Sequence, residues 1–161
     1  MLIKLLLTDV DGVLTDNGVF YTEAGEVMKK FSIRDGMGVE RLRKIAGVET
    51  GIITGELSPS VARRAEKLAI KELHLGVKDK LGRLTEILSR LKLEWAEIAY
   101  IGDDVNDLEV LEHVGIAGCP ADAMPHVRAV AHYICTNKGG EGAFREFAEW
   151  IINENQKHRK V

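Results

Sequence analysis

The sequence has few cysteines, no basic excess and no long hydrophobic run. Its two cysteines, Cys119 and Cys135, are too few for a disulfide framework, so we expect reduced thiols, as in a cytoplasm. The formal net charge of −3 provides no positive field for a nucleic-acid partner. Apolar runs such as 5–7 and 52–53 are too short to span a bilayer, and the N-terminal stretch has no small-residue cleavage site. We therefore expect a cytoplasmic protein that binds neither membranes nor nucleic acids.

Linkers, internal repeats and low-complexity segments are also missing. The 161 residues have an ordinary globular balance, with 45% hydrophobic and 29% charged residues. A chain of this length suits one compact domain, so we expect residues 1–161 to fold as a single unit.

Short apolar runs alternate with helical patterns along the chain. Strands are predicted at 3–8, 48–54, 70–75, 98–102, 116–119 and 132–136. Helices are predicted at 36–46, at about 58–69 behind Ser58-Pro59, at about 79–91, at 107–114 and at about 142–155, before a polar and frayed tail at 156–161. The stretch 17–32 alternates apolar and polar residues around a central turn, which predicts a β-hairpin. This order predicts an α/β fold with a mostly parallel sheet and helices on both faces.

Acidic residues gather where the predicted strands end. Asp9 and Asp11 follow the first strand, Thr54-Gly55 follows the second, and GDDVND (102–107) follows the fourth. Because the carboxyl ends of parallel strands meet at one edge of a sheet, these residues should lie together. The acids of this group are Asp9, Asp11, Asp103, Asp104 and Asp107. Their repulsion and desolvation would be relieved by a hard divalent cation such as Mg²⁺.

Carboxylates around Mg²⁺ indicate phosphate chemistry. Asp9 can attack phosphorus as a nucleophile, and Asp11 can carry a proton to and from the reacting groups. Thr54 offers a hydroxyl to a phosphoryl oxygen, and Gly55 leaves backbone amides accessible. Lys80, at the start of a predicted helix, can neutralise phosphate charge. Taken singly, Asp104 and Asp107 could cap helices instead, and Lys80 could be a solvated surface lysine.

Four motifs resemble those of the haloacid dehalogenase superfamily of phosphohydrolases. They are DVDGVLTD (9–16), IITG (52–55), Lys80 and GDDVND (102–107), in the same order along the chain. The resemblance implies a three-layer Rossmann-like fold, with Asp9 as nucleophile and Asp11 as general acid and base. It also implies that Mg²⁺ is bound by Asp9, Asp103 and the backbone carbonyl of Asp11. Asp104 and Asp107 would hold metal-bound waters or orient Lys80.

Two further segments resemble the capless 3-deoxy-D-manno-octulosonate 8-phosphate phosphatases of this superfamily. These are FSIRDGMGVERL (31–42) and NKGGEGAFREF (137–147), and no segment between the motifs is long enough for a cap domain. The resemblance implies a homotetramer whose hairpins (17–32) meet at its centre. It also implies that the Gly-rich segment and C-terminal helix and tail (137–161) reach toward a neighbour's site, although Gly139, Gly140 and Gly142 could belong to an ordinary loop.

The resemblance implies a sugar-acid phosphate as substrate and a role in lipopolysaccharide precursor synthesis. Arg34, Arg64 and Arg145 become candidate substrate contacts, with surface ion pairs or an exposed helix arginine as the other readings. Glu56 departs from the octulosonate pattern, in which an arginine often follows Thr-Gly. It resembles the branch that acts on nine-carbon sugar acids, so a nine-carbon 9-phosphate is the second candidate substrate.

Two alternatives belong to other functional classes. A receiver-like signalling domain would be phosphorylated at Asp9, but such domains lack an acid two residues later, which makes Asp11 the discriminating residue. A non-catalytic activator domain of a sugar-nucleotide enzyme is disfavoured because all the catalytic motifs are intact.

Overall fold

The computed structural model describes residues 2–159 and contains a six-stranded parallel sheet between two layers of helices. The strand order is β5 (Glu72–His74), β4 (Glu49–Ile53), β1 (Leu5–Thr8), β6 (Ile98–Ile101), β7 (Ile116–Cys119) and β8 (Tyr133–Ile134). Every neighbouring pair in this sheet is parallel. The predicted α/β class and parallel sheet are therefore confirmed.

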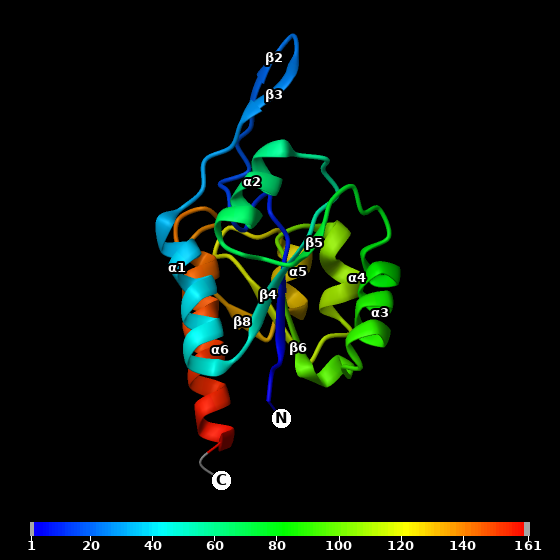
Figure 1. Cartoon of the computed structure of the whole chain (residues 1–161), viewed down its shortest axis with the longest axis vertical. Coiled ribbons are helices and arrows are strands. Elements are labelled where there is room, and N and C mark those ends of the chain that lie inside the picture. Colours follow the sequence, from blue (N-terminus) through cyan, green and yellow to red (C-terminus); the bar gives the residue numbers. More distant parts are fainter. Residues whose placement is uncertain (1, 160–161) are drawn as a thin grey trace.

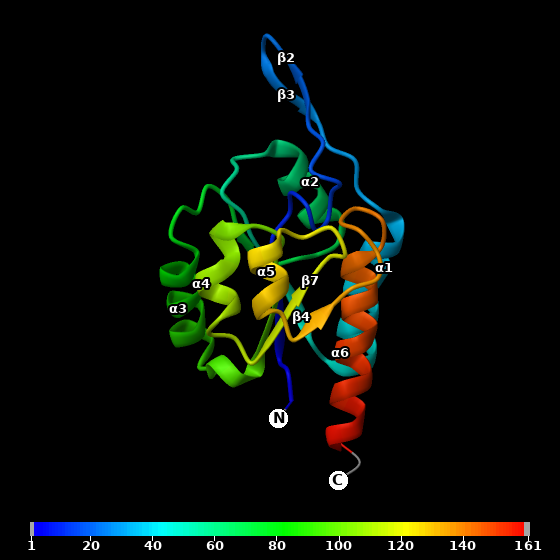
Figure 2. The same ribbon diagram turned by 180° about the vertical axis from the view of Figure 1, so that it is seen from behind.

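The helices divide between the two faces of the sheet. One layer contains α1 (Ile33–Arg41), α2 (Pro59–Lys67) and α6 (Ala143–Arg159), and the other contains α3 (Lys80–Leu91), α4 (Leu108–Leu111) and α5 (Pro125–Val130) (Figures 1 and 2). Successive residues of β1 face opposite layers, because Leu6 packs in the first hydrophobic cluster while Leu5 and Leu7 pack in the second. This central strand is buried on both faces, as its apolar run Leu5–Leu7 predicted.

The helix starts agree with the capping signals in the sequence. The Ser58 hydroxyl accepts from the Val61 amide with Pro59 in the first turn of α2, and the Asp79 carboxylate accepts from the Gly82 amide at the start of α3. The helix predicted over 36–46 is α1, which begins at Ile33 and continues through a π-helical turn (Leu42–Ala46). The helix predicted over 107–114 is shorter, with a 3₁₀ turn (Val105–Asp107) before α4.

Two features differ from the sequence prediction. Helix α5 was not predicted, because only Val127 of its six residues is buried and no apolar periodicity marks it. The polar tail was expected to fray, but α6 continues to Arg159, whose guanidinium donates to the Ala46 carbonyl at 2.6 Å. The remaining two residues of that tail lie outside the described residues.

The predicted β-hairpin forms and projects from the body of the molecule (Figure 1). Its strands are β2 (Phe20–Thr22) and β3 (Gly25–Met28), which pair in antiparallel fashion. The Asp16 carboxylate accepts from the Gly18 amide at 3.0 Å and so caps the turn that leads into this hairpin. Across residues 2–159, no helix combines the length and the apolar character needed to cross a membrane.

Candidate active site

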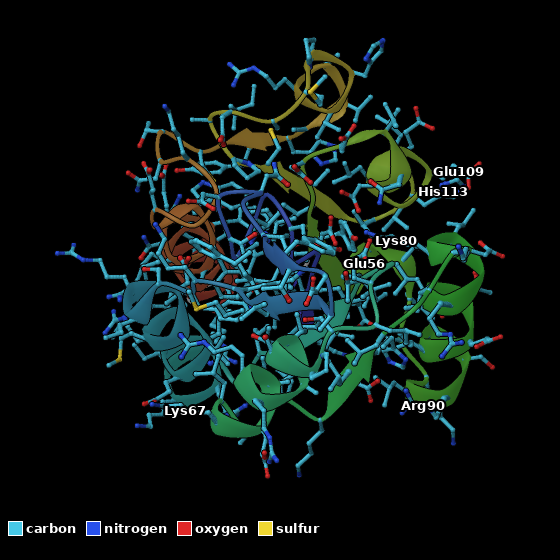
Figure 3. The ribbon with its side chains drawn as sticks, turned by 90° about the horizontal axis from the view of Figure 1, so that it is seen from above. Glu56, Lys67, Lys80, Arg90, Glu109 and His113 are labelled. Carbon is cyan, nitrogen blue, oxygen red and sulfur yellow. The ribbon has the colours of Figure 1, made fainter. Side chains whose placement is uncertain are left out.

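The sequence-predicted motifs meet at the carboxyl edge of the sheet. Asp9 follows β1, Thr54 follows β4, and Asp103 follows β6, and these three strands are neighbours at the centre of the sheet. A cavity of about 170 Å³ lies at this edge, lined by Asp9, Asp11, Asn17, Thr54, Gly55, Glu56, Asp103, Asp104 and Asn106. Figure 3 views this edge from above and labels Glu56, which lines the cavity, and Lys80, which lies buried beside Asp9.

Asp9 is held rigidly at the base of the cavity. It is 5% exposed, and its Oδ1 accepts from its neighbour's amide, Val10 N, at 2.8 Å and lies 3.1 Å from Lys80 Nζ. Burial raises the pKa of the Asp9 carboxyl from 3.8 to about 8, and the charge of Asp107 adds to the rise while Lys80 opposes it. A second positive charge is therefore needed for Asp9 to be an anionic nucleophile at neutral pH.

Lys80 is fixed by a buried network that includes Asp107 and Tyr100. Asp107 Oδ1 accepts from Lys80 Nζ and from the Tyr100 hydroxyl, each at 2.7 Å, and Asp107 is fully buried. Burial acts to lower the pKa of Lys80, but the charges of Asp9 and Asp107 outweigh it and the pKa is raised. The lysine is therefore a permanent ammonium aimed at Asp9.

The second oxygen of Asp107 shapes the turn after β6. Oδ2 accepts from the amides of Asp103 at 3.0 Å and Asp104 at 3.4 Å. Both oxygens of Asp107 thus already have donors, which suits a residue that orients Lys80 and the loop. Asp104 instead caps the short 3₁₀ turn, where its Oδ1 accepts from Val105 N at 2.6 Å.

Asp103 faces Asp9 across the cavity. One oxygen from each of Asp9, Asp103 and Asp107 lies within 4.8 Å of the others. Burial raises the pKa of Asp103 to about 6; a hydrogen bond from Asn17 Nδ2 at 3.2 Å opposes the rise, and nearby acids increase it. Asp9 and Asp103 are thus two crowded carboxylates that favour a bound cation.

Gly12 allows this close approach. Its φ is +87°, and a Cβ at this position would lie 1.9 Å from Asp103 Oδ2 and 2.7 Å from Asn17 Nδ2. Glycine is therefore required both by the backbone conformation and by the space that the Asp103 carboxylate occupies.

Asp11, from DVDGVLTD, and Thr54 and Gly55, from IITG, also line the cavity. Asp11 is less buried than Asp9, with a side chain 25% exposed. Thr54 is 1% exposed, and its Oγ1 accepts from the Glu56 amide at 3.3 Å. A Cβ at Gly55 would meet only an ordinary contact with the Val77 carbonyl at 3.6 Å. Gly55 is thus not required for packing, which is consistent with a role in presenting backbone amides.

The structure places only some of the candidate substrate residues at the cavity. Glu56 lines the cavity, whereas Arg34, Arg64 and Arg145 are not among the lining residues. The Arg64 guanidinium donates to the Ser32 carbonyl at 3.0 Å and lies 5.7 Å above the Phe31 ring. Arg145 Nε pairs with Glu149 at 2.7 Å on α6. Arg34 is exposed on α1.

The Gly-rich segment packs against the loop that follows Asp9. Gly140 N donates to the Val13 carbonyl at 2.9 Å, and a Cβ at Gly139 would lie 1.9 Å from the Gly12 carbonyl oxygen. Close backbone contact within one chain is therefore a sufficient reason for these two glycines.

Four residues of the site were not identified from the sequence. Asn17 and Asn106 line the cavity, Tyr100 supports Asp107, and Lys29 Nζ lies 2.6 Å from Asp11 Oδ1. Tyr100 had a usable signal, because a tyrosine in an otherwise aliphatic buried strand needs a partner for its hydroxyl. The other three depend on how loops fold back onto the site, which periodicity does not reveal.

Comparisons with known proteins agree with this geometry. Residues 47–146, more than half of the chain, match the model of the haloacid dehalogenase-like hydrolases. The chain is 39% identical over 150 residues to the 3-deoxy-D-manno-octulosonate 8-phosphate phosphatase of Yersinia pestis, covering 93% of this chain and 80% of that protein.

Solved structures of such phosphatases are also similar. The cobalt-bound enzyme of Haemophilus influenzae has a TM-score of 0.92 at 35% identity, covering 96% of this chain and 90% of that one. The enzyme of Moraxella catarrhalis, in complex with magnesium, phosphate and 3-deoxy-D-manno-octulosonate, has a TM-score of 0.89 at 38% identity, covering 98% and 92%. This chain belongs to the haloacid dehalogenase-like hydrolases and is a phosphatase of that family.

Proposed function

We propose that this protein is a Mg²⁺-dependent phosphomonoesterase that hydrolyses 3-deoxy-D-manno-octulosonate 8-phosphate, a step in lipopolysaccharide precursor synthesis. The observation that carries the proposal is the pairing of buried Asp9 with Lys80 at 3.1 Å, where Asp9 and Asp103 together line one cavity at the sheet edge. The relatives named for this reaction, and the Moraxella catarrhalis complex with magnesium, phosphate and the product sugar acid, support the choice of substrate.

The residues present fit a magnesium ion. Asp9 and Asp103 supply carboxylate oxygens, and burial raises the pKa of both groups, so a bound divalent cation would favour their ionised forms. Together with the backbone carbonyl of Asp11 they would hold the ion, while Asp107 orients Lys80 and Asp104 caps its turn. When bound, Mg²⁺ supplies positive charge that keeps Asp9 ionised and draws the phosphate toward it.

The first half of the reaction transfers the phosphoryl group to the protein. A carboxylate oxygen of Asp9 attacks phosphorus, and the bond from phosphorus to the sugar oxygen breaks as an aspartyl phosphate forms. Asp11 donates its proton to the departing sugar oxygen, so that the sugar acid leaves as an alcohol. Lys80, the Thr54 hydroxyl and the Gly55 amide stabilise the negative charge on the phosphoryl oxygens.

The second half returns the protein to its starting state. Asp11, now a carboxylate, takes a proton from a water molecule whose oxygen attacks phosphorus. The bond between phosphorus and Asp9 breaks, which releases inorganic phosphate and leaves Asp11 protonated for the next cycle. Two acids with different exposure thus perform two different roles, since the Asp9 side chain is 7% exposed and the Asp11 side chain is 25% exposed.

Phosphate release from 3-deoxy-D-manno-octulosonate 8-phosphate tests this function. We expect release that requires Mg²⁺, stops with EDTA and is abolished by Asp9→Asn. Asp16→Asn is the matched control, because Asp16 is 44% exposed at the hairpin turn and should leave the rate unchanged. Normal turnover by Asp9→Asn, or turnover that EDTA does not affect, would contradict the mechanism.

The same assay separates the other functional classes. A receiver-like domain would accumulate a long-lived phosphoprotein without turnover, and a non-catalytic activator domain would release no phosphate as an isolated chain. Turnover by the isolated chain is therefore the result that excludes both.

A nine-carbon sugar-acid 9-phosphate is the second candidate substrate, because Glu56 lies in the cavity wall. A carboxylate there can accept hydrogen bonds from sugar hydroxyls but offers no attraction to a substrate carboxylate. Steady-state rates on the eight-carbon and nine-carbon substrates should therefore shift in favour of the eight-carbon one in Glu56→Arg. An unchanged preference would show that this position does not select the substrate. We keep Arg34, Arg64 and Arg145 as proposed substrate contacts. They would make these contacts after a rearrangement or in the site of a neighbouring subunit.

We also propose a cytoplasmic homotetramer of single-domain subunits (1–161), with the hairpin (17–32) at its interface. The hairpin supports this proposal because Phe20, Tyr21, Val27 and Met28 are each more than half exposed. In such an assembly the segment 137–161 would lie near a neighbour's site. Light scattering that reports a monomer would contradict the tetramer.

A further inference from the structure

Lys29 has a buried side chain at the base of an exposed hairpin. It directly follows β3, and its side chain is 2% exposed, whereas that of the adjacent Lys30 is 71% exposed. Its ammonium lies 2.6 Å from Asp11 Oδ1 and 3.7 Å from Glu26 Oε1. A buried ammonium requires such partners, because an unpaired one would carry a large desolvation cost.

A chain of contacts also joins Lys29, through Glu26, to the start of α2. Glu26 Oε1 accepts from the Ser58 hydroxyl at 3.0 Å, and Ser58 is buried at the start of α2. The loop between Thr54 and Ser58 contributes Gly55 and Glu56 to the cavity wall. Lys29 therefore stands between the hairpin, the loop after β4 and the residue that carries the proton.

We propose that Lys29 is a positioning residue for Asp11, an inference that rests on the proposed phosphatase function. Within residues 2–159, Lys29 provides the only side-chain hydrogen bond to the Asp11 carboxylate. With Oδ1 bound to the ammonium, Oδ2 is the oxygen that remains to hold the proton and face the sugar oxygen. The pairing thus fixes the rotamer of a partly exposed side chain that must deliver a proton with good geometry.

A purely structural role is the competing explanation. In that case Lys29 would only attach the hairpin to the body, and its loss would reduce activity on every phosphate ester equally. The geometry favours Asp11 as the main partner, since the distance to Asp11 is 2.6 Å and the distance to Glu26 is 3.7 Å.

Two substrates with different leaving groups separate these roles. The sugar-acid phosphate is an alkyl ester whose leaving oxygen needs a proton, whereas p-nitrophenyl phosphate releases a stabilised anion that does not. We expect Lys29→Met to lower kcat/KM for 3-deoxy-D-manno-octulosonate 8-phosphate by about tenfold or more, part of the roughly 10²–10⁴-fold that a general acid contributes. The loss for p-nitrophenyl phosphate should be at most about threefold. Both values come from one preparation, so their ratio is independent of the folded fraction.

Three controls accompany this variant. Lys30→Met removes an exposed lysine of the same hairpin and should change neither value. Glu26→Gln weakens the attachment to Ser58 but keeps the Lys29 contact with Asp11, so the ratio should stay that of the wild type. Lys29→Arg restores a cation and should recover part of the ratio.

The outcomes test the positioning role of Lys29 separately from the phosphatase function. Equal losses on the two substrates in Lys29→Met, or a Glu26→Gln ratio that falls as far, would refute the positioning role while leaving the phosphatase assignment intact. A wild-type protein that hydrolyses neither substrate would overturn the proposed function and this inference with it.

Discussion

Asp103→Asn should stabilise the metal-free protein while it abolishes activity. Asp103 is 6% exposed and lies close to Asp9 and Asp107, and within residues 2–159 its one side-chain hydrogen-bond donor is the Asn17 amide at 3.2 Å. An asparagine of the same shape keeps an oxygen for Asn17 but removes the buried charge. The variant thus separates the cost of the charge from the packing of the side chain.

The magnitude follows from the pKa of Asp103, which burial raises from 3.8 to about 6. About two pH units correspond to about 3 kcal/mol of differential stability. Because the folded pKa is the higher one, this cost is absent below about pH 4, grows between pH 4 and 6, and is complete above pH 6. For a chain of this size, about 3 kcal/mol raises Tm by about 6–12 °C.

Thermal unfolding in EDTA, measured for wild type and Asp103→Asn from pH 4 to pH 8, is the assay. The variant should have the higher Tm at pH 8, and the difference should disappear toward pH 4. Mg²⁺ should raise the Tm of the wild type and have little effect on the variant, because one of its carboxylate ligands is gone. Glu109→Gln, at an exposed carboxylate on α4, should match the wild type throughout.

Either of two results would refute the reasoning. One is an Asp103→Asn protein that is less stable than wild type in EDTA at pH 8, since the buried charge would then not be a net cost. The other is a Mg²⁺-induced Tm shift of wild-type size in the variant, since Asp103 would then not contribute to the metal site.

Three further predictions concern residues around the site. Asp35 is 2% exposed, and burial raises its pKa to about 6. Asp35→Asn should therefore increase the free energy of unfolding in urea by about 2–3 kcal/mol above pH 6 and leave it unchanged near pH 4. The increase should be the same with and without Mg²⁺. Tyr100→Phe removes the hydroxyl that donates to Asp107 at 2.7 Å, so urea unfolding should show a loss of about 1.5–3 kcal/mol; an unchanged midpoint would show that this hydroxyl is not needed. Gly139→Ala would place a Cβ 1.9 Å from the Gly12 carbonyl oxygen; unfolding should cost about 2 kcal/mol less, and phosphatase assays should show a lower kcat, whereas wild-type values would mean that the segment can move aside.

The sheet and the catalytic motifs were predictable because each depends on local sequence. An apolar run identified β1, and the rule that parallel strands end at one edge predicted that Asp9, Thr54 and Asp103 lie together, as they do. Ser58 marked a helix start through a short-range hydrogen bond, which also needs no tertiary information.

The remainder depended on contacts between segments far apart in the sequence. Lys29 and Lys30 are adjacent lysines at the end of the predicted hairpin, and only the fold shows that Lys29 turns inward to Asp11 while Lys30 turns outward. Arg64 and Arg145 had the chemistry of substrate ligands, but a backbone carbonyl and a glutamate close by provide their partners in this chain. Packing decides whether a lysine or arginine side chain contacts the substrate or another part of its own chain, and a short motif does not specify that packing.

The register of β1 has a consequence for how this protein can evolve. Thr8, the residue before Asp9, is paired with Ile52 on one side and Ile101 on the other. A slip of one residue would shift the strand by about 3.3 Å and turn every side chain to the opposite face, so that the core itself would be lost. A variant in which β1 slips in this way would misfold, so selection would remove it whatever its effect on catalysis. New substrate preferences can therefore arise in the loops beyond the strands, where Glu56 lies, while the reaction itself is inherited unchanged.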